Sequence, residues 1–276
     1  MKKFVALILL SLFVISSIKG QYDAQYSQAT DFCSVFNPAV IALSDEATVL
    51  GLNRQQWVGW KNSPKTTIFN ASVPLKINKS THGVGVLFNN DGAGLFANQG
   101  VCLQYAYGKA VLKGELGVGT SIGVINSTFK GSEVFIPESD YHQAVDGFIP
   151  ALDENGLAAD LAIAVAYSDE LIHTGISLLH LTKPKISLGE KIEISINPLL
   201  NFMFQYNLVL PNTLYKMEPF VFYKTDFVSS QLEMGSKVEY ENKYIGGVSF
   251  RYQDAVILKV GFKTNSGMVL GYSYDI

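Results

Sequence analysis

The dominant pattern from about Glu46 onward is an alternation of apolar residues with polar or small residues, with a period of two. In residues 113–125 one face is charged, small or glycine, and the other is mostly apolar: Leu116, Val118, Thr120, Ile122 and Val124. The same alternation recurs in residues 231–240, 256–263 and 268–275. Such a period is typical of a β-strand whose two faces meet different environments. The sequence therefore predicts an all-β protein.

The alternating segments number about thirteen, and most are near the ~9–11 residues that a tilted strand needs to cross a bilayer. No helical segment separates them, which argues against a parallel βαβ architecture. Residues 46–276 are therefore predicted to form a transmembrane antiparallel outer-membrane β-barrel, with about 14 strands expected because such barrels have an even number. A soluble β protein, which also alternates, is the alternative interpretation.

Aromatic residues are concentrated at the predicted strand ends, where tyrosine and tryptophan suit a membrane interface. The tyrosines concerned are Tyr105, Tyr107, Tyr167, Tyr223, Tyr240, Tyr252, Tyr272 and Tyr274. Both tryptophans, Trp57 and Trp60, lie in the stretch RQQWVGWKNSP at residues 54–64. We expect them to anchor the first strand at the interface while Arg54 and Lys61 reach polar groups. Packing of the pair in a soluble core is the alternative.

The predicted connections alternate in length over the first eight strands. Longer ones (58–65, 90–98, 126–156 and 182–191) alternate with short ones (78–80, around 108–110, and 168–170). Long extracellular loops and short periplasmic turns are typical of outer-membrane barrels. Residues 208–214, which should form a short turn, do not fit this pattern.

The N-terminus has the features of a secretory signal peptide over residues 1–20. Lys2 and Lys3 precede an apolar run over residues 4–15, and small residues follow up to Gly20. The run is shorter than the ~20 apolar residues of a membrane-spanning helix. We expect an exported protein of the cell outer membrane, with residues 21–45 as an N-terminal periplasmic or plug segment.

Composition and motifs argue against several other functions. The net charge is −3 without a basic run, so nucleic acid is not an expected partner. The histidines lack metal-ligand spacing, and no cofactor site is predicted. The GTSIG stretch at residues 119–123 matches a nucleophile elbow, but Ser121 lies mid-strand with no helix after it. Cys33 and Cys102 either pair or remain free thiols, and the sequence does not choose.

The predicted loop at residues 126–156 is acidic, with Lys130 as its only Lys or Arg, and it also contains apolar residues. The candidate partner-binding residues are Phe129, Glu133, Phe135, Ile136, Asp140 and Phe148. Loops of this length are usually functional or disordered, so partner binding and simple solvation both remain open. A small-solute channel is the alternative function, because Ala158, Ala162, Ala164 and Ala166 would give one strand an inward face of small residues.

Several stretches together resemble one family of proteins. They are QYDAQYSQ (21–28), FNPAV (36–40), RQQWVGWKNSPKT (54–66), GVGVLFNNDGAG (83–94), TGISLLHL (174–181) and GYSYDI (271–276). The chain resembles the PorP/SprF family of outer-membrane barrels of type IX secretion and gliding motility in Gram-negative bacteria. The most specific residues of this resemblance, treated as a family motif or interface, are Asn37, Pro38, Arg54, Gln55, Gln56, Trp57 and Trp60.

The resemblance implies a non-enzymatic component of the secretion machinery. Its implied partners are outer-membrane lipid, periplasmic components of the apparatus, and a secreted surface protein or adhesin. The chain departs from the family in having AVIAL at residues 39–43, where an A-G step is expected, and in stopping at GYSYDI.

The odd strand count creates a further expectation. With thirteen strands, the last would end at the cell surface with an unpaired edge, which costs several kcal/mol for each bare backbone group in hydrocarbon. Either the sequence is truncated by about one hairpin return, or the N-terminal residues 32–42 substitute for the missing strand.

Overall fold

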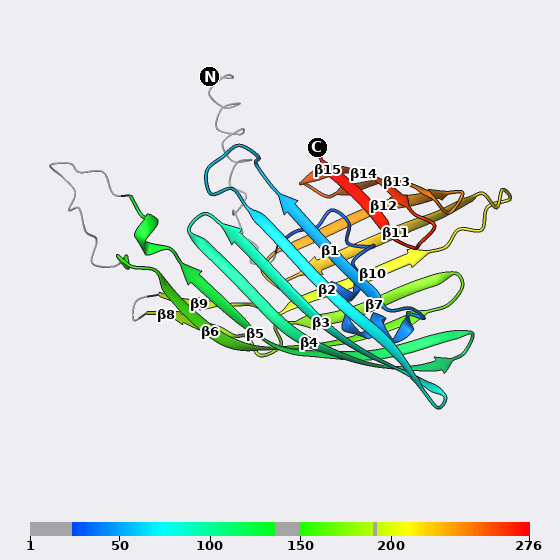
Figure 1. The fold of residues 1–276 in the computed structure, drawn as a ribbon, viewed down its shortest axis with the longest axis horizontal. Coiled ribbons are helices and arrows are strands. Elements are labelled where there is room, and N and C mark those ends of the chain that lie inside the picture. The colour runs from blue at the N-terminus through cyan, green and yellow to red at the C-terminus, as the bar shows by residue number, and fades with distance from the viewer. Residues whose placement is uncertain (1–23, 136–148, 190–191) are drawn as a thin grey trace, which may run out of the picture.

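The computed structural model describes residues 24–135, 149–189 and 192–276. Thirteen strands form one sheet in which every neighbouring pair is antiparallel (Figure 1). A separate hairpin of two strands, β8 and β9, lies between β7 and β10 in the sequence. The strands are β1 (Thr48–Gln55), β2 (Lys65–Ile77), β3 (Ser80–Ala93), β4 (Phe96–Val111), β5 (Gly114–Phe129), β6 (Glu154–Ser168), β7 (Ile172–Leu179), β8 (Lys185–Leu188), β9 (Ile192–Ser195), β10 (Leu199–Tyr206), β11 (Tyr215–Thr225), β12 (Ser230–Tyr240), β13 (Tyr244–Arg251), β14 (Ala255–Lys263) and β15 (Val269–Asp275).

The predicted all-β antiparallel fold and the count of about thirteen strands in one sheet are confirmed. The only helical elements in the described part of the chain are α2 (Cys33–Phe36), η1 (Pro38–Leu43) and η2 (Gly131–Glu133). Within those described residues, none of the helices has the length and apolar character needed to cross a membrane.

The two faces of the sheet follow the predicted alternation. In β5, Val118 is 51% exposed on the outer face while the neighbouring Gly119 is buried on the inner face. In β14, Leu258 is 48% exposed whereas Lys259 is only 6% exposed. Apolar side chains therefore point outward and polar side chains point inward, which is the reverse of a soluble protein and is typical of a barrel surrounded by lipid.

The meander places its connections at two ends of the sheet. We call one the loop end, which carries residues 56–64, 130–153 and 180–198, and the other the turn end, which carries residues 78–79, 112–113 and 169–171. Figure 1 shows residues 130–135 and 149–153 at the left and the short turns at the right.

Several predicted connections are wrong in position, because strands β2 to β6 are longer than expected. The predicted long loop 90–98 is a turn at Gly94 and Leu95, and the turn expected around 108–110 lies at 112–113. Residues 126–129 and 154–156 of the predicted loop 126–156 belong to β5 and β6 instead. After β10 the alternation of lengths stops, since the turn-end connection 207–214 is longer than the loop-end connection 226–229.

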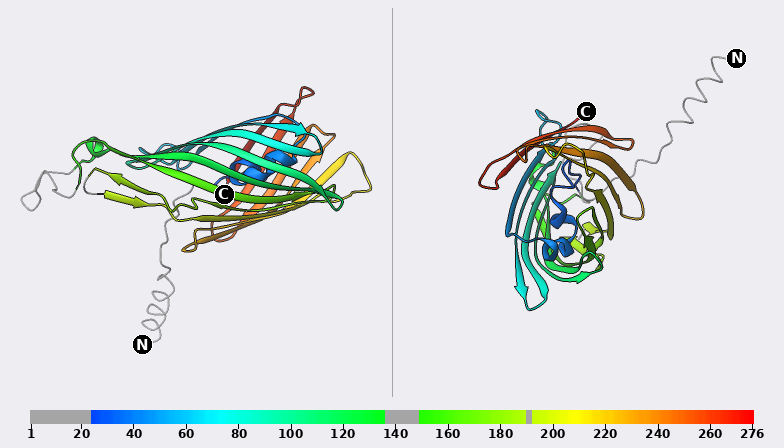
Figure 2. Two further views of the ribbon diagram at one scale, coloured as in Figure 1. Left: turned by 90° about the horizontal axis from the view of Figure 1, so that it is seen from below. Right: turned by 90° about the vertical axis from the view of Figure 1, so that its right-hand side faces the viewer.

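The sheet curls around an interior, so that its first and last strands approach each other (Figure 2, right). Thirteen alternating strands give β1 and β15 the same direction, as their arrows in Figure 1 show. Among the described residues no ladder joins these two edge strands. We call the line where they meet the seam.

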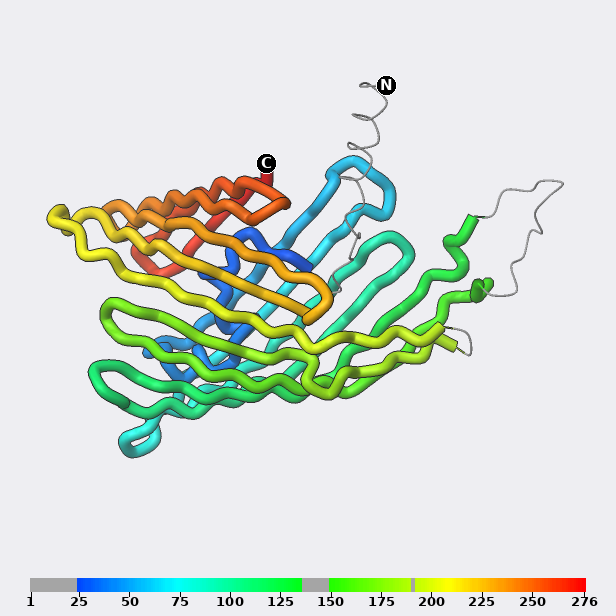
Figure 3. The backbone as a smooth tube through the Cα atoms, turned by 180° about the vertical axis from the view of Figure 1, so that it is seen from behind, coloured from blue at the N-terminus to red at the C-terminus, as the bar shows by residue number. Residues whose placement is uncertain are grey.

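Residues 24–43, which we call the interior segment, lie inside the curl (Figures 2 and 3). The expectation that residues 32–42 substitute for a missing strand is wrong, because they form α2 and η1 instead. Pro38 at the first position of η1 suits a helix start, since that position needs no N–H donor.

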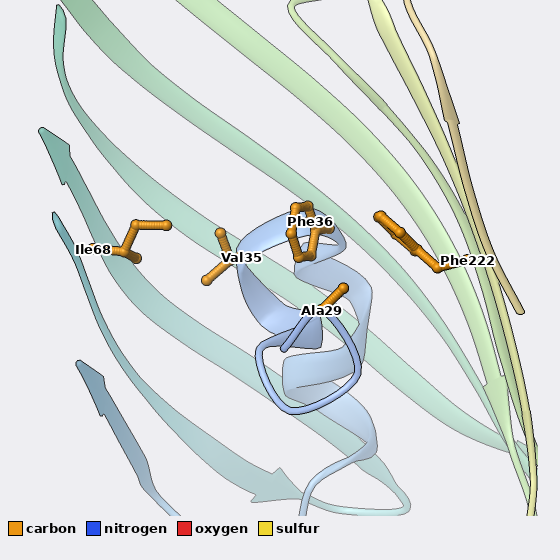
Figure 4. Close-up of a cluster of buried hydrophobic side chains, with 5 residues drawn as sticks. All are labelled: Ala29, Val35, Phe36, Ile68 and Phe222. Atoms are coloured by element: carbon orange, nitrogen blue, oxygen red, sulfur yellow. The ribbon is translucent and has the colours of Figure 1, made fainter. Parts of the chain in front are cut away.

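A buried apolar cluster joins the interior segment to opposite walls of the sheet (Figure 4). Phe36 packs against Phe222 of β11 with ring centroids 5.1 Å apart, while Val35 faces Ile68 of β2. At the position of this cluster, the interior segment therefore supplies the apolar surface that fills the space between the two walls of the sheet.

Candidate functional site

Glycines of the inner face allow η1 to lie directly on the sheet. A Cβ added at Gly119 would lie 2.4 Å from the backbone N of Ala39, and one at Gly83 would lie 2.6 Å from Ile41 Cγ2. Real Cβ atoms do not come so close to other atoms, so any larger residue would push η1 away. Gly108, Gly117 and Gly175 meet the same segment at 2.6–2.7 Å. These glycines form a cradle for η1 near the turn end.

The small residues of β6 complete this cradle. Ala164 and Ala166 are buried against Ala39 of η1. Of the inward alanines that suggested an open lumen, these two are therefore covered by the interior segment.

Asn37 fixes the start of η1 to two strands. Its Oδ1 accepts a hydrogen bond from the N–H of Ala39, and its Nδ2 donates to the carbonyls of Val165 in β6 and Ile176 in β7. An asparagine at this position caps the helical turn and satisfies strand carbonyls at the same time. The predicted motif residues Asn37 and Pro38 are thus both buried anchors of the interior segment.

A buried polar network holds α2 against the sheet. Ser34 Oγ donates to Asn70 Oδ1 at 2.9 Å, and Asn70 Nδ2 donates to Gln104 Oε1 at 2.8 Å. Gln104 Nε2 returns a hydrogen bond to the carbonyl of Ser34. Because each donor has a partner, the network orients the segment at little desolvation cost.

Charged residues of β11 to β15 hold the first residues of the interior segment at the loop end. Lys224 Nζ donates to the carbonyl of Ala24, and Arg251 Nη2 donates to the carbonyl of Tyr26. Ser27 Oγ donates to Asp275 Oδ1. Since Ala42 lies by Gly108 near the turn end, the interior segment runs through the interior from the loop end to the turn end.

Arg251 is the centre of this charged cluster and is 1% exposed. It contacts Glu233 Oε2 at 3.1 Å, Asp275 Oδ2 at 3.1 Å and Asp254 Oδ2 at 3.1 Å. A buried guanidinium needs such compensation, and removing one partner of a buried pair typically costs ~3–5 kcal/mol. Closer to the turn end of the same wall, Lys237 bridges Asp31 and Glu218, with Nζ–carboxylate distances of 3.2 and 2.8 Å.

The same cluster extends to the seam. Arg54 Nη2 of β1 lies 3.6 Å from Asp275 Oδ2 of β15, and Arg54 Nη1 also donates to Gln56 Oε1. The carboxylate of Asp275 therefore contacts β1, β13 and the interior segment together. Gln55 lies on the outer face instead, where its Nε2 donates to Asn53.

Trp57 and Trp60 lie in the loop after β1, not in the strand. They are 66% and 78% exposed, and the N–H of Trp60 donates to the carbonyl of Trp57 within a tight turn. Trp57 has a φ of 52°, which is rare for a residue with a large side chain. Both indoles point away from the fold, so a shared soluble core does not account for them.

The residues predicted to bind a partner at 126–156 are separated by the structure. Phe129 is buried in a second apolar cluster with Ile186 and Leu188 of β8, and its ring packs on Phe96. Glu133 pairs with Lys130 at 3.1 Å, whereas Phe135 is 86% exposed. Ile136, Asp140 and Phe148 lie outside the described residues.

The cysteines, whose pairing the sequence left open, are both free. Cys33 Sγ lies against Met203 of β10, whereas Cys102 lies on β4. Burial raises the pKa of the Cys33 thiol to about 12, with Asp31 adding to the effect. A thiol with a raised pKa is mostly protonated at neutral pH, and a protonated thiol reacts slowly.

Sequence reasoning missed Arg251, Asp275 and Glu233 as a cluster. The inward position of Glu233 was available from the alternation, and charge on an inward face of a barrel strand is a signal for such a network. Their convergence on residues 25–27 was not available, because it joins positions more than two hundred residues apart.

Comparison with protein families gives one match that spans nearly the whole chain. Residues 18–276 match the family described as type IX secretion system membrane protein PorP/SprF. This chain belongs to the PorP/SprF family. No curated protein matches it. As a member of PorP/SprF it is a membrane component of type IX secretion, in agreement with its outward apolar and inward polar faces.

Proposed function

We propose that this chain is a non-enzymatic outer-membrane component of the type IX secretion and gliding machinery that supports export or surface attachment of secreted proteins or adhesins. Family membership supports the secretion role. The observation that carries the outer-membrane location is the sheet itself, with apolar side chains outside, charged side chains inside and most strands long enough to cross a bilayer.

The loop end faces the cell exterior in this proposal. Long connections at one end and short turns at the other are typical of outer-membrane barrels, and the longest connections, 130–153 and 180–198, are both at the loop end. The secreted protein or adhesin binds there, and Phe135, exposed beside the charged Glu133, is the described residue best placed to contact it. Periplasmic components of the apparatus bind at the turn end.

The interior segment acts as a plug in this proposal. It passes through the interior from end to end, covers Ala164 and Ala166 of β6 and joins opposite walls through Phe36 and Val35. An occupied interior supports a scaffold that holds partners in place and argues against a small-solute channel.

Affinity purification of the tagged chain from native membranes tests this proposal. We expect secretion-apparatus components or a large surface adhesin to co-purify, and a variant lacking residues 136–148 to retain the apparatus components but lose the surface protein. Purified chain without partners should give no ion conductance in planar bilayers. Steady conductance, with no apparatus component recovered, would establish the channel function instead.

A further inference from the structure

A row of polar side chains crosses the outer face of five adjacent strands near the loop end. Its members are direct cross-strand partners, each on the face that carries the outward apolar residues. In order from β1 to β5 they are Asn53, Thr67, Asn90, Gln99 and Asn126. We call them the amide row. Four strand spacings of ~4.8 Å make it about 19 Å wide.

The amide row lies directly above an apolar surface. The next row toward the turn end consists of Phe69, Phe88, Val101 and Val124, and these side chains are 46, 37, 45 and 42% exposed. The row after it contains Val86, Leu103 and Ile122, which are also exposed. Such a continuous outward apolar band faces hydrocarbon. The amide row therefore lies where hydrocarbon ends and headgroups begin.

Polar and aromatic residues continue beyond the amide row. Gln55 pairs across the ladder with Lys65, which is exposed, and the connection above them carries Trp57 and Trp60 with their indoles exposed. The outward positions that follow the amide row toward the loop end on β1 to β5 are Gln55, Lys65, Gly92, Ala97 and Thr128. Together with the amide row, these positions include one lysine and neither aspartate nor glutamate. Carboxylates of this region, such as Asp91, lie on the inner face.

Part of the amide row is already ordered by its own hydrogen bonds. Asn53 Nδ2 donates to Thr67 Oγ1 at 3.0 Å, and Gln55 Nε2 donates to Asn53 Oδ1 at 3.2 Å. An amide fixed in this way presents its remaining donor and acceptor in a set direction, which lowers the entropy lost on binding a ligand.

We propose that the amide row binds the sugar headgroup of an anionic glycolipid of the outer leaflet. Amide and hydroxyl groups match the donors and acceptors of sugar hydroxyls, while the acyl chains lie on the apolar band below. The exposed Trp57 and Trp60 offer flat faces to sugar rings, and Lys65 attracts the anionic groups. This inference rests on the proposed outer-membrane location with the loop end outward.

The chemistry favours a glycolipid over a phospholipid. A phospholipid headgroup is a compact charge, and it is best bound by clustered Lys and Arg side chains. Neutral amides spread over about 19 Å instead suit a headgroup of several sugar rings with many hydroxyls.

Binding measurements on the purified full chain in detergent test the proposal, with lipopolysaccharide lacking O-chains and phosphatidylglycerol as probes. The variant Asn90→Val with Gln99→Val and Asn126→Val removes three amides but keeps strand-compatible side chains. Each lost hydrogen bond weakens binding severalfold, so we expect at least about tenfold weaker lipopolysaccharide binding. The control Ser236→Val, an outward polar-to-apolar change on β12, should bind like the wild type.

Unchanged affinity in a triple variant that keeps its heat-modifiable gel mobility would overturn the proposal, as would equal competition by phosphatidylglycerol. Should the triple variant fail to fold, the pair Gln99→Glu and Asn126→Asp keeps the face polar and should weaken binding by repelling the anionic headgroup. Membrane fractionation separates this result from the proposed function. Recovery of the chain in the inner membrane overturns the proposed location. Recovery in the outer membrane, with variants that bind lipopolysaccharide as tightly as the wild type, overturns only the glycolipid site.

Discussion

Arg54 Nη2 and Asp275 Oδ2 lie 3.6 Å apart and link the first strand of the sheet to the last. These strands run in the same direction and share no ladder among the described residues, so this side-chain contact is made where backbone pairing is missing. Asp275 also accepts from Arg251 and Ser27. The seam is therefore fastened from the inside by the charged cluster and the interior segment.

Replacing the shared carboxylate should weaken the closed form. Asp275→Asn removes the charge that faces Arg54 and Arg251, and we expect a loss of ~1–3 kcal/mol in the free energy of unfolding. The temperature at which the heat-modifiable band converts on gels measures the effect. Asp254→Asn is the matched control, because Asp254 contacts the same Arg251 from a more exposed position and should cost less. Equal shifts would show that the seam contact adds nothing.

The glycine cradle should not tolerate even one added methyl group. Gly119→Ala would force η1 away from β5, and we expect ~1–3 kcal/mol of destabilisation, the usual cost of overpacking. Limited proteolysis should then release residues 24–43 faster than in the wild type. Gly246→Ala on β13 is the control, since nothing lies within 4 Å of its added Cβ. If both variants behave alike, close packing of η1 is not what requires glycine.

Charge on the outer face should be costly only within the apolar band. Val118→Arg and Leu258→Arg should each lose ~2–4 kcal/mol of stability in lipid, because both side chains lie on the outward face that meets hydrocarbon in the proposed location. Gln99→Arg, also outward but in the amide row, should cost under about 1 kcal/mol. Urea titrations of folding into vesicles compare the three variants, and a large loss for Gln99→Arg would place the bilayer boundary elsewhere.

The Cys33 thiol should resist alkylation in the folded protein. Only a thiolate reacts quickly, and with a pKa raised to about 12 the group stays protonated at pH 8 and gains reactivity only as the pH approaches 12. Iodoacetamide at pH 8 should label Cys33 after denaturation but not before, as read by mass spectrometry of its peptide. Rapid labelling of folded chain would mean that the interior segment leaves its site.

Phe129 at the end of β5 and Phe135 in the connection after it should behave differently on mutation. Phe129→Ala removes a buried ring from the cluster around Ile186, and we expect a loss of ~3–5 kcal/mol. Phe135→Ala should leave stability unchanged because its side chain is 86% exposed. If the loop binds the surface protein, Phe135→Ala reduces display without altering the amount of folded barrel. Normal display in that variant would argue for a solvated loop.

The sequence by itself determined which residues of each strand share the outward apolar face. The alternation separates Val118 from Gly119 and Leu258 from Lys259, and the structure puts the first of each pair on the outer face and the second on the inner face, because side chains alternate strictly along a strand. It also determined the number of strands in the sheet. Connection boundaries were less well determined, since β2 to β6 continue beyond the apolar band into polar residues such as Asn90 that resemble loop residues.

Only the tertiary structure decided what fills the interior. The periodicity of β5 shows that Gly119 is inward but not that Ala39 lies against it, and nothing local to Arg251 indicates Tyr26 as its partner. The alternation arises from contacts of each residue with its immediate surroundings, whereas these pairs join positions far apart in the chain. Such contacts exist only once the sheet has curled, so the seam, the cradle and the placement of Asn37 and Pro38 required the folded molecule.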